Sequence, residues 1–326
     1  MCLAGVDKQR ICRPAIVWLL LFVLVPSALA QHAKCLFVSS YHHGHAWSDG
    51  IERGLRQKLA DKCELRQFDM DTTHKKSEQQ MREAGLAAKR LIESWRPDVV
   101  IAADDDAAKY LIQPYFRDTD LPIVFCGINW TISEYGFPFH NVTGMIEVAP
   151  VKVMIEESIG LVPGASRTLF IGANTVTERK NAARIRKVAE SHGLQFEAQF
   201  ASSLASWLSA YTRGQGYDFV IIGSNAGIDD WDDRRALEAI RAVTRRLSVT
   251  SHEWMMPVTM LGMTKVPEEQ GEWAAQVALQ ILDGAKPDSI PVIANRKWDL
   301  YLNPALIDAA GLELPEQLLS KGKVFQ

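Results

Sequence analysis

Residues 98–107 read Asp-Val-Val-Ile-Ala-Ala-Asp-Asp-Asp-Ala, and this stretch decides the fold class. Val99–Ala103 is a nearly continuous run of β-branched and small apolar residues, which is typical of a strand buried on both faces of a parallel sheet. Three aspartates follow at once, where such a strand ends and the chain turns toward a helix. The stretch therefore predicts an α/β fold, in which ligands bind beyond the carboxyl ends of the strands.

Strands and helices alternate in both directions from this stretch. We expect further strands at 36–40, 64–70, 122–128, 141–147, 168–173, 194–200, 219–223 and 257–261. We expect helices at 48–59, 77–95, 106–116, 151–161, 178–192, 204–212, 232–247, 268–282 and 304–310, with Ser48 and Ser77 capping the first two. Right-handed crossovers make such sheets doubly wound, so two rounds of the pattern predict two doubly wound parallel-sheet lobes.

Length and charge narrow the class of protein. The chain has 326 residues, which suits two domains of ordinary size, and 47% of its residues are hydrophobic. The formal net charge is -3, so no surplus of basic residues indicates a nucleic-acid partner or an anionic membrane surface. We therefore expect a globular protein that does not bind nucleic acid.

The first 30 residues have the three parts of a secretory signal peptide. Lys8, Arg10 and Arg13 form a basic start, an apolar run follows at 15–25, and the small-residue site Ala-Leu-Ala occupies 28–30. The apolar run has roughly half of the ~20 residues that span a bilayer. We expect cleavage directly after the small-residue site and a periplasmic mature chain, with an uncleaved membrane anchor as the alternative.

The chain contains five cysteines, and Cys35, Cys63 and Cys126 follow the predicted signal peptide. Cys35 and Cys63 begin the first two predicted strands, and both lie at the same edge if those strands are neighbours in a parallel sheet. Export permits a disulfide between them, and both the bonded and the free state stay open. Cys126 lies in an apolar strand and is expected to be a buried free thiol.

Small polar and aromatic residues follow the predicted strands, at the end where doubly wound sheets bind ligands. The candidate ligand-binding residues are Ser40, Tyr41, Trp47, Asp104, Asp105, Asn129, Asn174, Ser224 and Asn225. Hydrogen-bonding groups that converge beside aromatic surface are what a small-molecule pocket needs. Serine and asparagine at strand ends also serve as caps and turn formers, so these residues have a purely structural alternative.

The predicted roles follow from side-chain chemistry. Tyr41 and Trp47 provide apolar walls or stacking surfaces, and the serines and asparagines provide hydrogen bonds. Asp104 or Asp105 pairs with a cationic group such as an amine. An amino-acid-like ligand suits this combination.

Two clusters are weaker candidates for metal binding. His42, His43 and His45 lie close together, but no carboxylate or cysteine accompanies them at a fixed spacing. Asp104–Asp106 more simply cap the helix that follows, because the helix dipole favours negative charge there. The chain also lacks a Gly-x-Ser-x-Gly elbow, a Gly-x-x-x-x-Gly-Lys loop, a Gly-x-Gly-x-x-Gly turn and a His-Glu-x-x-His pair. We therefore expect no metal, no cofactor and no enzymatic activity.

Taken in order, several stretches of the chain resemble the periplasmic substrate-binding components of ABC transporters, which have the type I periplasmic binding protein fold. The stretches are 39–48, which reads Ser-Ser-Tyr-His-His-Gly-His-Ala-Trp-Ser, and 98–107, 122–129, 274–284 and 302–315. The resemblance covers most of the mature chain and is closest to the branch whose relatives also serve as sensor modules. Family members with known ligands bind small solutes, some of them aromatic amino acids.

The resemblance also implies how two lobes divide the chain. The amino-terminal lobe holds 31–147 plus 267–290, the carboxyl-terminal lobe holds 148–266 plus 291–326, and a hinge joins them around a cleft. The implied function is capture of a small molecule between the lobes and its delivery to an ABC permease. A periplasmic ligand-sensing subunit of a signalling system is the first alternative. A secreted enzyme that uses the aspartate cluster with a metal, and a protein whose cleft serves only interaction, are the others.

Overall fold

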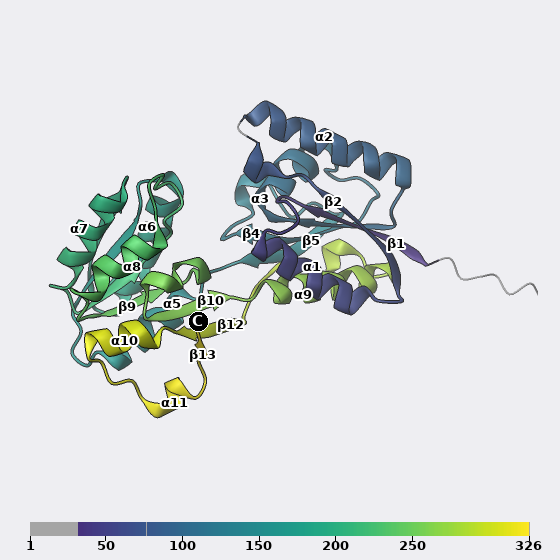
Figure 1. Cartoon of the computed structure of the whole chain (residues 1–326). Coiled ribbons are helices and arrows are strands. Elements are labelled where there is room, and N and C mark those ends of the chain that lie inside the picture. Colours follow the sequence, from purple (N-terminus) through teal and green to yellow (C-terminus); the bar gives the residue numbers. More distant parts are fainter. Residues whose placement is uncertain (1–31, 76, 326) are drawn as a thin grey trace, which may run out of the picture. The chain divides into compact units, whose positions relative to one another are not determined.

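The computed structural model describes residues 32–75 and 77–325 (Figure 1). The predicted signal peptide, residues 1–30, lies outside the described residues. Within the described part of the chain, no helix is both long enough and apolar enough to cross a membrane.

Six strands form the first sheet of the described chain, and all of their pairings are parallel. In spatial order they are β11 (Ile293–Ala294), β5 (Val142–Glu147), β4 (Ile123–Asn129), β3 (Val99–Ala103), β1 (Ala33–Ser39) and β2 (Cys63–Asp69). Every residue of β3 is buried, as its unbroken apolar run predicts for a central strand.

Helices cover both faces of this sheet, because successive strand residues point to opposite faces. The helices are α1 (Ala46–Leu59), α2 (Glu78–Trp95), α3 (Asp104–Ala107), α4 (Gln113–Tyr115) and α9 (Pro267–Leu282), with a π-helical stretch, η2 (Ala108–Ile112), between α3 and α4. α1 and α9 pack on one face, against Phe37 and Ile101. α2, α3 and η2 pack on the other face, against Leu36 and Val100 (Figure 1).

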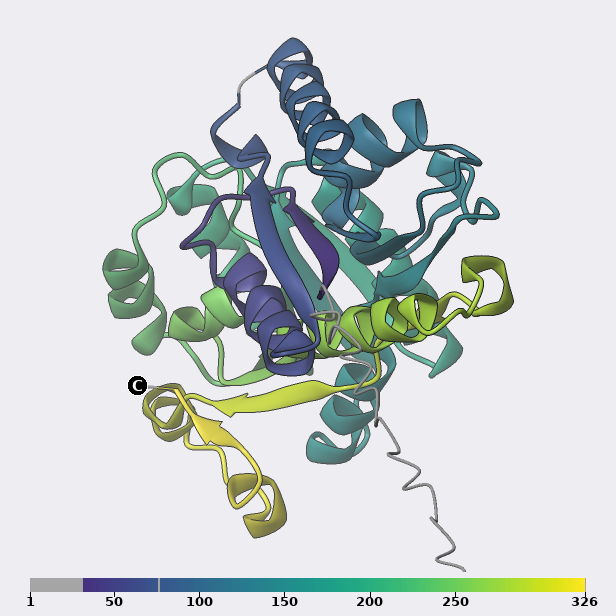
Figure 2. The ribbon, with the colours of Figure 1, turned by 90° about the vertical axis from the view of Figure 1, so that its right-hand side faces the viewer.

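α9 is far from α1 in the sequence, but the two helices cross closely. A Cβ added to Gly271 of α9 would lie 2.0 Å from the Ile51 carbonyl oxygen, and one added to Gly54 of α1 would lie 2.4 Å from the Glu268 carbonyl oxygen. Glycine is therefore needed on both sides of the crossing. Figure 2 shows the two helices, purple and yellow-green, side by side. The chain thus returns to the first lobe after building most of the second.

The second sheet of the described chain has seven strands. In spatial order they are β13 (Lys323–Val324), β12 (Trp298–Leu302), β10 (Leu261–Lys265), β9 (Leu247–Thr250), β8 (Phe219–Ile222), β6 (Arg167–Ala173) and β7 (Gln195–Ala201). Its pairings are parallel except that of β10 with β12, which is antiparallel.

The helices of the second lobe are α5 (Val151–Leu161), α6 (Val176–Ser191), α7 (Leu204–Gly214), α8 (Asp233–Arg241), α10 (Pro304–Ala310) and α11 (Glu316–Leu319). Four of them, α5, α6, α7 and α8, share one apolar core with strands β6, β8 and β9. The prediction of two α/β lobes with parallel sheets is confirmed.

Near the middle of the second sheet, one predicted helix is too long and one predicted strand is misplaced. The helix expected at 232–247 is shorter, and 247–250 form strand β9, whose β-branched valine and threonine favour extended backbone. The strand expected at 257–261 is wrong as well. Its first two residues belong to a 3₁₀ helix, η4 (Glu253–Val258), and the strand begins only at its last residue, as β10. Pro257 has no backbone N–H to donate, which disfavours it in a central strand.

The two predicted helix caps have different outcomes. Ser77 caps α2 as expected, because its Oγ accepts a hydrogen bond from the Gln80 backbone N–H and the Gln80 side chain accepts one from the Ser77 N–H. Ser48 is not a cap. α1 begins earlier, at Ala46, and Ser48 is buried within its first turn.

The chain passes between the two sheets three times within the described residues. It passes after β5, again between β10 and α9, and finally between β11 and β12. β11 pairs with β5, so the first sheet takes in residues up to Ala294, four beyond the lobe boundary expected at 290. The lobe boundaries themselves stay a prediction.

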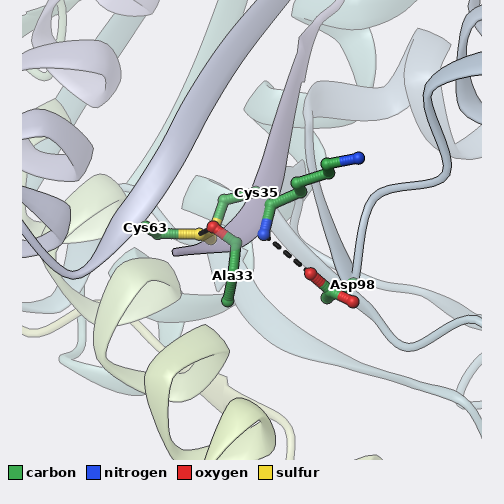
Figure 3. Close-up of a disulfide and its surroundings, with 5 residues drawn as sticks. Ala33, Cys35, Cys63 and Asp98 are labelled. Atoms are coloured by element: carbon green, nitrogen blue, oxygen red, sulfur yellow. Dashed lines mark hydrogen bonds between the residues drawn. A yellow bond between two sulfur atoms is a disulfide. The ribbon is translucent and has the colours of Figure 1, made fainter. Parts of the chain in front are cut away.

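Cys35 and Cys63 are joined by a disulfide, one of the two states that the sequence left open (Figure 3). They lie on the neighbouring strands β1 and β2, and their Cα atoms are 5.9 Å apart. Beside the disulfide, the backbone N–H of Lys34 donates a 2.7 Å hydrogen bond to Asp98 Oδ2. Cys126 in β4 is a buried free thiol, and burial raises its pKa well above the ordinary value.

Candidate functional site

A cleft of about 1690 Å³ is lined by residues of both lobes. The first lobe contributes the loops that follow β1, β3 and β4, and the second contributes the loop after β8, the start of α6 and the end of β10. These positions lie at the carboxyl ends of parallel strands, where α/β sheets bind ligands.

The structure brings six of the nine predicted site residues to the cleft wall. They are Tyr41, Trp47, Asp104, Asp105, Asn129 and Ser224. The other three, Ser40, Asn174 and Asn225, are not among the residues that line it.

Ser40 has a structural role instead. Its hydroxyl donates a 2.6 Å hydrogen bond to the Ala103 carbonyl and accepts a 2.9 Å hydrogen bond from the Ala107 N–H, and the side chain is fully buried. Ser40 therefore ties the end of β1 to the start of α3.

The predicted residues of the second lobe are also engaged within the protein. Asn174 Nδ2 donates to Ser202 Oγ at 3.1 Å, and Asn174 Oδ1 accepts from Arg179 at 2.6 Å. The Asn225 carbonyl accepts a turn hydrogen bond from the Ile228 N–H. Ser224 lines the cleft, but its Oγ already accepts a 3.0 Å hydrogen bond from the Ala226 N–H.

Asp104 is the most unusual residue of the cleft. It has a left-handed backbone, with φ of 72°, and is only 2% exposed. Its Oδ1 accepts a 2.8 Å hydrogen bond from Trp47 Nε1, whereas its Oδ2 is buried with no partner among the described residues. Burial raises the pKa of this carboxyl well above its ordinary value. Gly127 permits the arrangement, since a Cβ there would lie 2.5 Å from Oδ1.

Asp105 orients its neighbours. One oxygen accepts a 2.6 Å hydrogen bond from the Tyr135 hydroxyl, and the other accepts from Asn129 Nδ2 at 2.8 Å and from the Asn129 backbone N–H. Burial and the Asp105 carboxylate raise the pKa of Tyr135 far above its usual range. The phenol therefore stays a hydrogen-bond donor at the cleft wall.

An ion pair joins the two sheets at the base of the cleft. Lys265, at the end of β10, pairs with Glu147, at the end of β5, and both side chains are largely buried. The Lys265 ammonium lies 5.2 Å from the centre of the Trp47 ring. Burial lowers the pKa of Lys265 to about 8, and the Asp104 carboxylate opposes this shift. Sequence reasoning missed this pair because its members are 118 residues apart.

The second-lobe wall contains a buried carboxylate and an aromatic surface. Glu178 is 2% exposed, accepts a 2.9 Å hydrogen bond from the Ser224 N–H, and has a pKa raised by burial. The rings of His252 and Trp254 are 4.5 Å apart, and Trp254 is 54% exposed. Burial lowers the pKa of His252 to about 4, so the imidazole is neutral at physiological pH. Sequence reasoning did not single out Glu178 or His252 as site residues.

Carboxylates outnumber cations around the cleft of the first lobe. Between β3 and the end of β5, the acidic lining residues of this lobe are Asp104, Asp105, Asp106, Glu134 and Glu147. Glu268 of α9 also lines the cleft and pairs with Arg53, the one lining lysine or arginine of this lobe among the described residues. Lys265 and Arg184 approach this wall from the second lobe, and Arg184 lies 4.7 Å from the Trp130 ring. Carboxylates therefore predominate on the first-lobe wall of the cleft.

The sequence of the chain matches a known protein family. The sequence profile of the family described as ABC transporter substrate binding protein matches residues 42–324. The chain belongs to this family. Among curated proteins, none matches the chain.

Solved structures of similar fold agree with the membership of the chain in this family. The ABC domain from Streptococcus pneumoniae in complex with L-Trp has a TM-score of 0.62 and 17% identity, covering 90% of this chain and 99% of that one. A ligand-free, open substrate binding protein with adhesive properties from Clostridium difficile has a TM-score of 0.73 and 12% identity, covering 90% and 99%. A periplasmic ribose ABC transporter protein from Conexibacter woesei has a TM-score of 0.58 and 13% identity, covering 86% and 96%. At these identities the likeness establishes the fold alone.

Proposed function

We propose that this substrate-binding protein captures a small organic molecule with a protonated amine in its cleft and delivers it to an ABC permease. The observation that carries the proposal is the orphaned, buried Oδ2 of Asp104 at a cleft wall rich in carboxylates. Burying a polar atom without a hydrogen-bond partner raises the free energy of the folded protein. A ligand that donates a hydrogen bond to this atom removes that penalty and so binds more tightly. A cationic donor also compensates the buried charge.

The rest of the cleft suits an amino-acid-like ligand with an apolar or aromatic side chain. Trp47 and Tyr41 stand beside Asp104, and the exposed face of Trp254 offers stacking surface on the opposite lobe. The similar Streptococcus pneumoniae domain was solved with L-Trp, which combines an amine with an aromatic ring. Closure of the lobes around the ligand would add contacts from the second wall.

In this proposal the protein acts in the periplasm and releases the solute to a membrane permease. Members of this family are substrate-binding components, and the cleft geometry supports binding without covalent chemistry. Asp104 acts by accepting a hydrogen bond and opposing charge, and Asp105 acts by holding Tyr135 and Asn129 in place.

The test is a binding screen that removes one ligand group at a time. Untagged protein comprising residues 31–326 is titrated with amino acids and with pairs that differ in the amine, such as L-tryptophan, tryptamine and indole-3-propionate. Ligands that bind the folded state raise the melting temperature by mass action. We expect shifts only with amine-bearing members of each pair.

The matched variant is Asp104→Asn, which keeps the size of the side chain and removes its charge. We expect it to weaken amine binding by at least about tenfold, since truncating one side of a buried charge pair costs 2–5 kcal/mol. Asp120→Asn serves as the control, because Asp120 is exposed and is not among the lining residues. Tight binding of a neutral or purely anionic solute, unaffected by Asp104→Asn, would show the proposal to be wrong.

A further inference from the structure

A second cluster of ionisable side chains lies at the rim of the cleft, outside the ligand site described above. It consists of His42 in the loop after β1 and of Asp71 and His74 in the loop after β2. The three potential ligand atoms all lie within 4.8 Å of one another. His74 Nδ1 is 2.6 Å from Asp71 Oδ1, and His42 Nδ1 is 3.7 Å from the same oxygen. Two imidazole nitrogens thus converge on a single carboxylate oxygen.

Backbone hydrogen bonds hold these two loops together. The Met70 N–H donates to the Ser39 carbonyl at 2.8 Å, and the Thr72 N–H donates to the Ser40 carbonyl at 2.9 Å. The Thr72 hydroxyl donates to the same Ser40 carbonyl. Because β1 and β2 are neighbouring parallel strands, their loops emerge side by side and remain in register. The sheet therefore holds the backbones of the two loops that carry the cluster next to each other.

The ring arrangement is better suited to an ion than to a simple hydrogen-bonded pair. The centroids of the His42 and His74 rings lie 4.4 Å apart, so both rings are within reach of a single ion. His42 Nδ1 has a 2.9 Å contact with Thr73 Oγ1, and Asp71 Oδ1 accepts a hydrogen bond from His74 Nδ1. Lys75 Nζ lies 3.9 Å from the other Asp71 oxygen, Oδ2. A single cation among the three groups would satisfy both nitrogens and the carboxylate together.

We propose that His42, Asp71 and His74 bind one zinc ion. Two imidazole nitrogens and one carboxylate oxygen form a ligand set that zinc accepts, with a fourth position left for water or solute. Tetrahedral zinc bonds of about 2.0–2.2 Å place the donor atoms roughly 3.4 Å apart. His74 Nδ1 and Asp71 Oδ1 would therefore separate to admit the ion, and His42 Nδ1 would move slightly closer to Asp71. His42 and Thr73 also line the cleft, so the ion would lie at the cleft wall.

A neighbouring cluster provides the internal control. His43 Nδ1 lies 3.5 Å from Asp49 and 3.7 Å from Glu52, but the His43 side chain is 78% exposed. Glu52 already accepts a 2.6 Å hydrogen bond from Arg56. The groups of this cluster are therefore less well placed to bind a metal ion. Substitution of His43 serves as the control for substitution of His42 and His74.

The experiment is titration of zinc chloride into untagged, chelator-treated protein comprising residues 31–326, followed by isothermal calorimetry. We expect one zinc ion per chain. His42→Ala and His74→Ala should each weaken zinc binding by at least about tenfold. Losing a residue that only hydrogen-bonds to a metal ligand already weakens metal binding by about this much. His43→Ala should leave the affinity unchanged. The absorption spectrum of bound cobalt(II) supplies a second readout, since its intensity separates four-coordinate from six-coordinate sites.

Two results would overturn the proposal. One is the absence of saturable zinc binding together with a cobalt spectrum that is unchanged from that of the aquo ion. The other is binding that survives His42→Ala and His74→Ala but is lost in His43→Ala, which would assign the ion to the second cluster. His74 is 65% exposed, so its removal leaves no cavity, and melting curves will verify that each variant is folded. The zinc titration is carried out without an amine ligand, so its outcome does not depend on the proposed solute.

Discussion

Asp104 is the residue whose surroundings most directly suggest a role in ligand binding. Its carboxylate is buried, one oxygen is fixed by Trp47, and the other has no partner among the described residues. Burial favours the protonated form, which explains the raised pKa. A cation beside the free oxygen would favour the charged form again, so the amine and the carboxylate would stabilise each other.

His252 provides a pH-dependent contribution to stability that can be measured separately. Burial lowers its pKa from 6.5 to about 4, so between these values the unfolded chain binds a proton that the folded chain does not. The contribution is therefore fully present above pH 6.5 and is lost as the pH falls through this window toward 4.

We expect the wild type to lose up to about 3 kcal/mol more than His252→Phe as the pH falls through this window. Phenylalanine keeps a ring against Trp254 and cannot titrate. Urea denaturation at a series of pH values measures the difference. Identical pH dependence in the two proteins would mean that His252 titrates normally.

Among the elements, the crossing of α1 and α9 is the most tightly constrained. Gly271→Ala would force a Cβ to within 2.0 Å of the Ile51 carbonyl oxygen, and backbone on both sides must move. We expect the free energy of unfolding to fall by about 2 kcal/mol or more, as overpacking of a close contact does. Denaturant unfolding monitored by circular dichroism measures the change.

Gly160→Ala is the control for this prediction. Gly160 also lies in a helix, α5, but an added Cβ there meets no atom within 4 Å. Alanine should stabilise this position by about 0.5–1 kcal/mol, because glycine loses more backbone freedom on folding. Equal effects of the two substitutions would show that α1 and α9 can separate without cost.

Elements with a strong local signal were predictable from the sequence. The apolar run Val99–Ala103 and the helix Val151–Leu161 have the predicted bounds. β9 was not predictable, since its four residues follow a helical pattern without an intervening turn signal. Short strands depend on neighbours in the sheet for their hydrogen bonds, and those neighbours are distant in the sequence.

The candidate site was predictable only in part, for a related reason. Strand ends identify the loops that border the cleft, which is why Trp47 and Asp104 were found. Whether a side chain then points into the cleft depends on its partners, and Ser40 turns inward to bond α3. The pairing of Lys265 with Glu147 depends on the path of the chain between the sheets. Local sequence patterns do not predict that path.

At the scale of the whole molecule, the disulfide and the cleft lie at opposite ends of the first sheet. Cys35 and Cys63 are near the amino ends of β1 and β2, whereas the cleft residues follow the carboxyl ends. The bond closes a loop with a sequence separation of 28, for which chain entropy predicts a stabilisation of about 3 kcal/mol.

We therefore expect reduction to lower the free energy of unfolding by about 3 kcal/mol while leaving the dissociation constant of the ligand unchanged. Denaturation with and without a reducing agent measures the first quantity, and calorimetry measures the second. A double variant, Cys35→Ala with Cys63→Ala, should not respond to the reducing agent. Loss of ligand affinity on reduction would indicate that the disulfide also shapes the cleft.

The three passages of the chain between the sheets also limit how such a protein can be recombined with a relative. The acidic wall, from Asp104 to Glu147, lies in one uninterrupted segment, so a single exchange transfers it intact. The second sheet is encoded in two separate segments, with α9 and β11 of the first sheet between them. A chimera that replaces the second lobe therefore needs three junctions, and the first of them falls beside Glu147, the partner of Lys265. The acidic wall can therefore be inherited as a block in this architecture, but each new second lobe must supply a partner for Glu147.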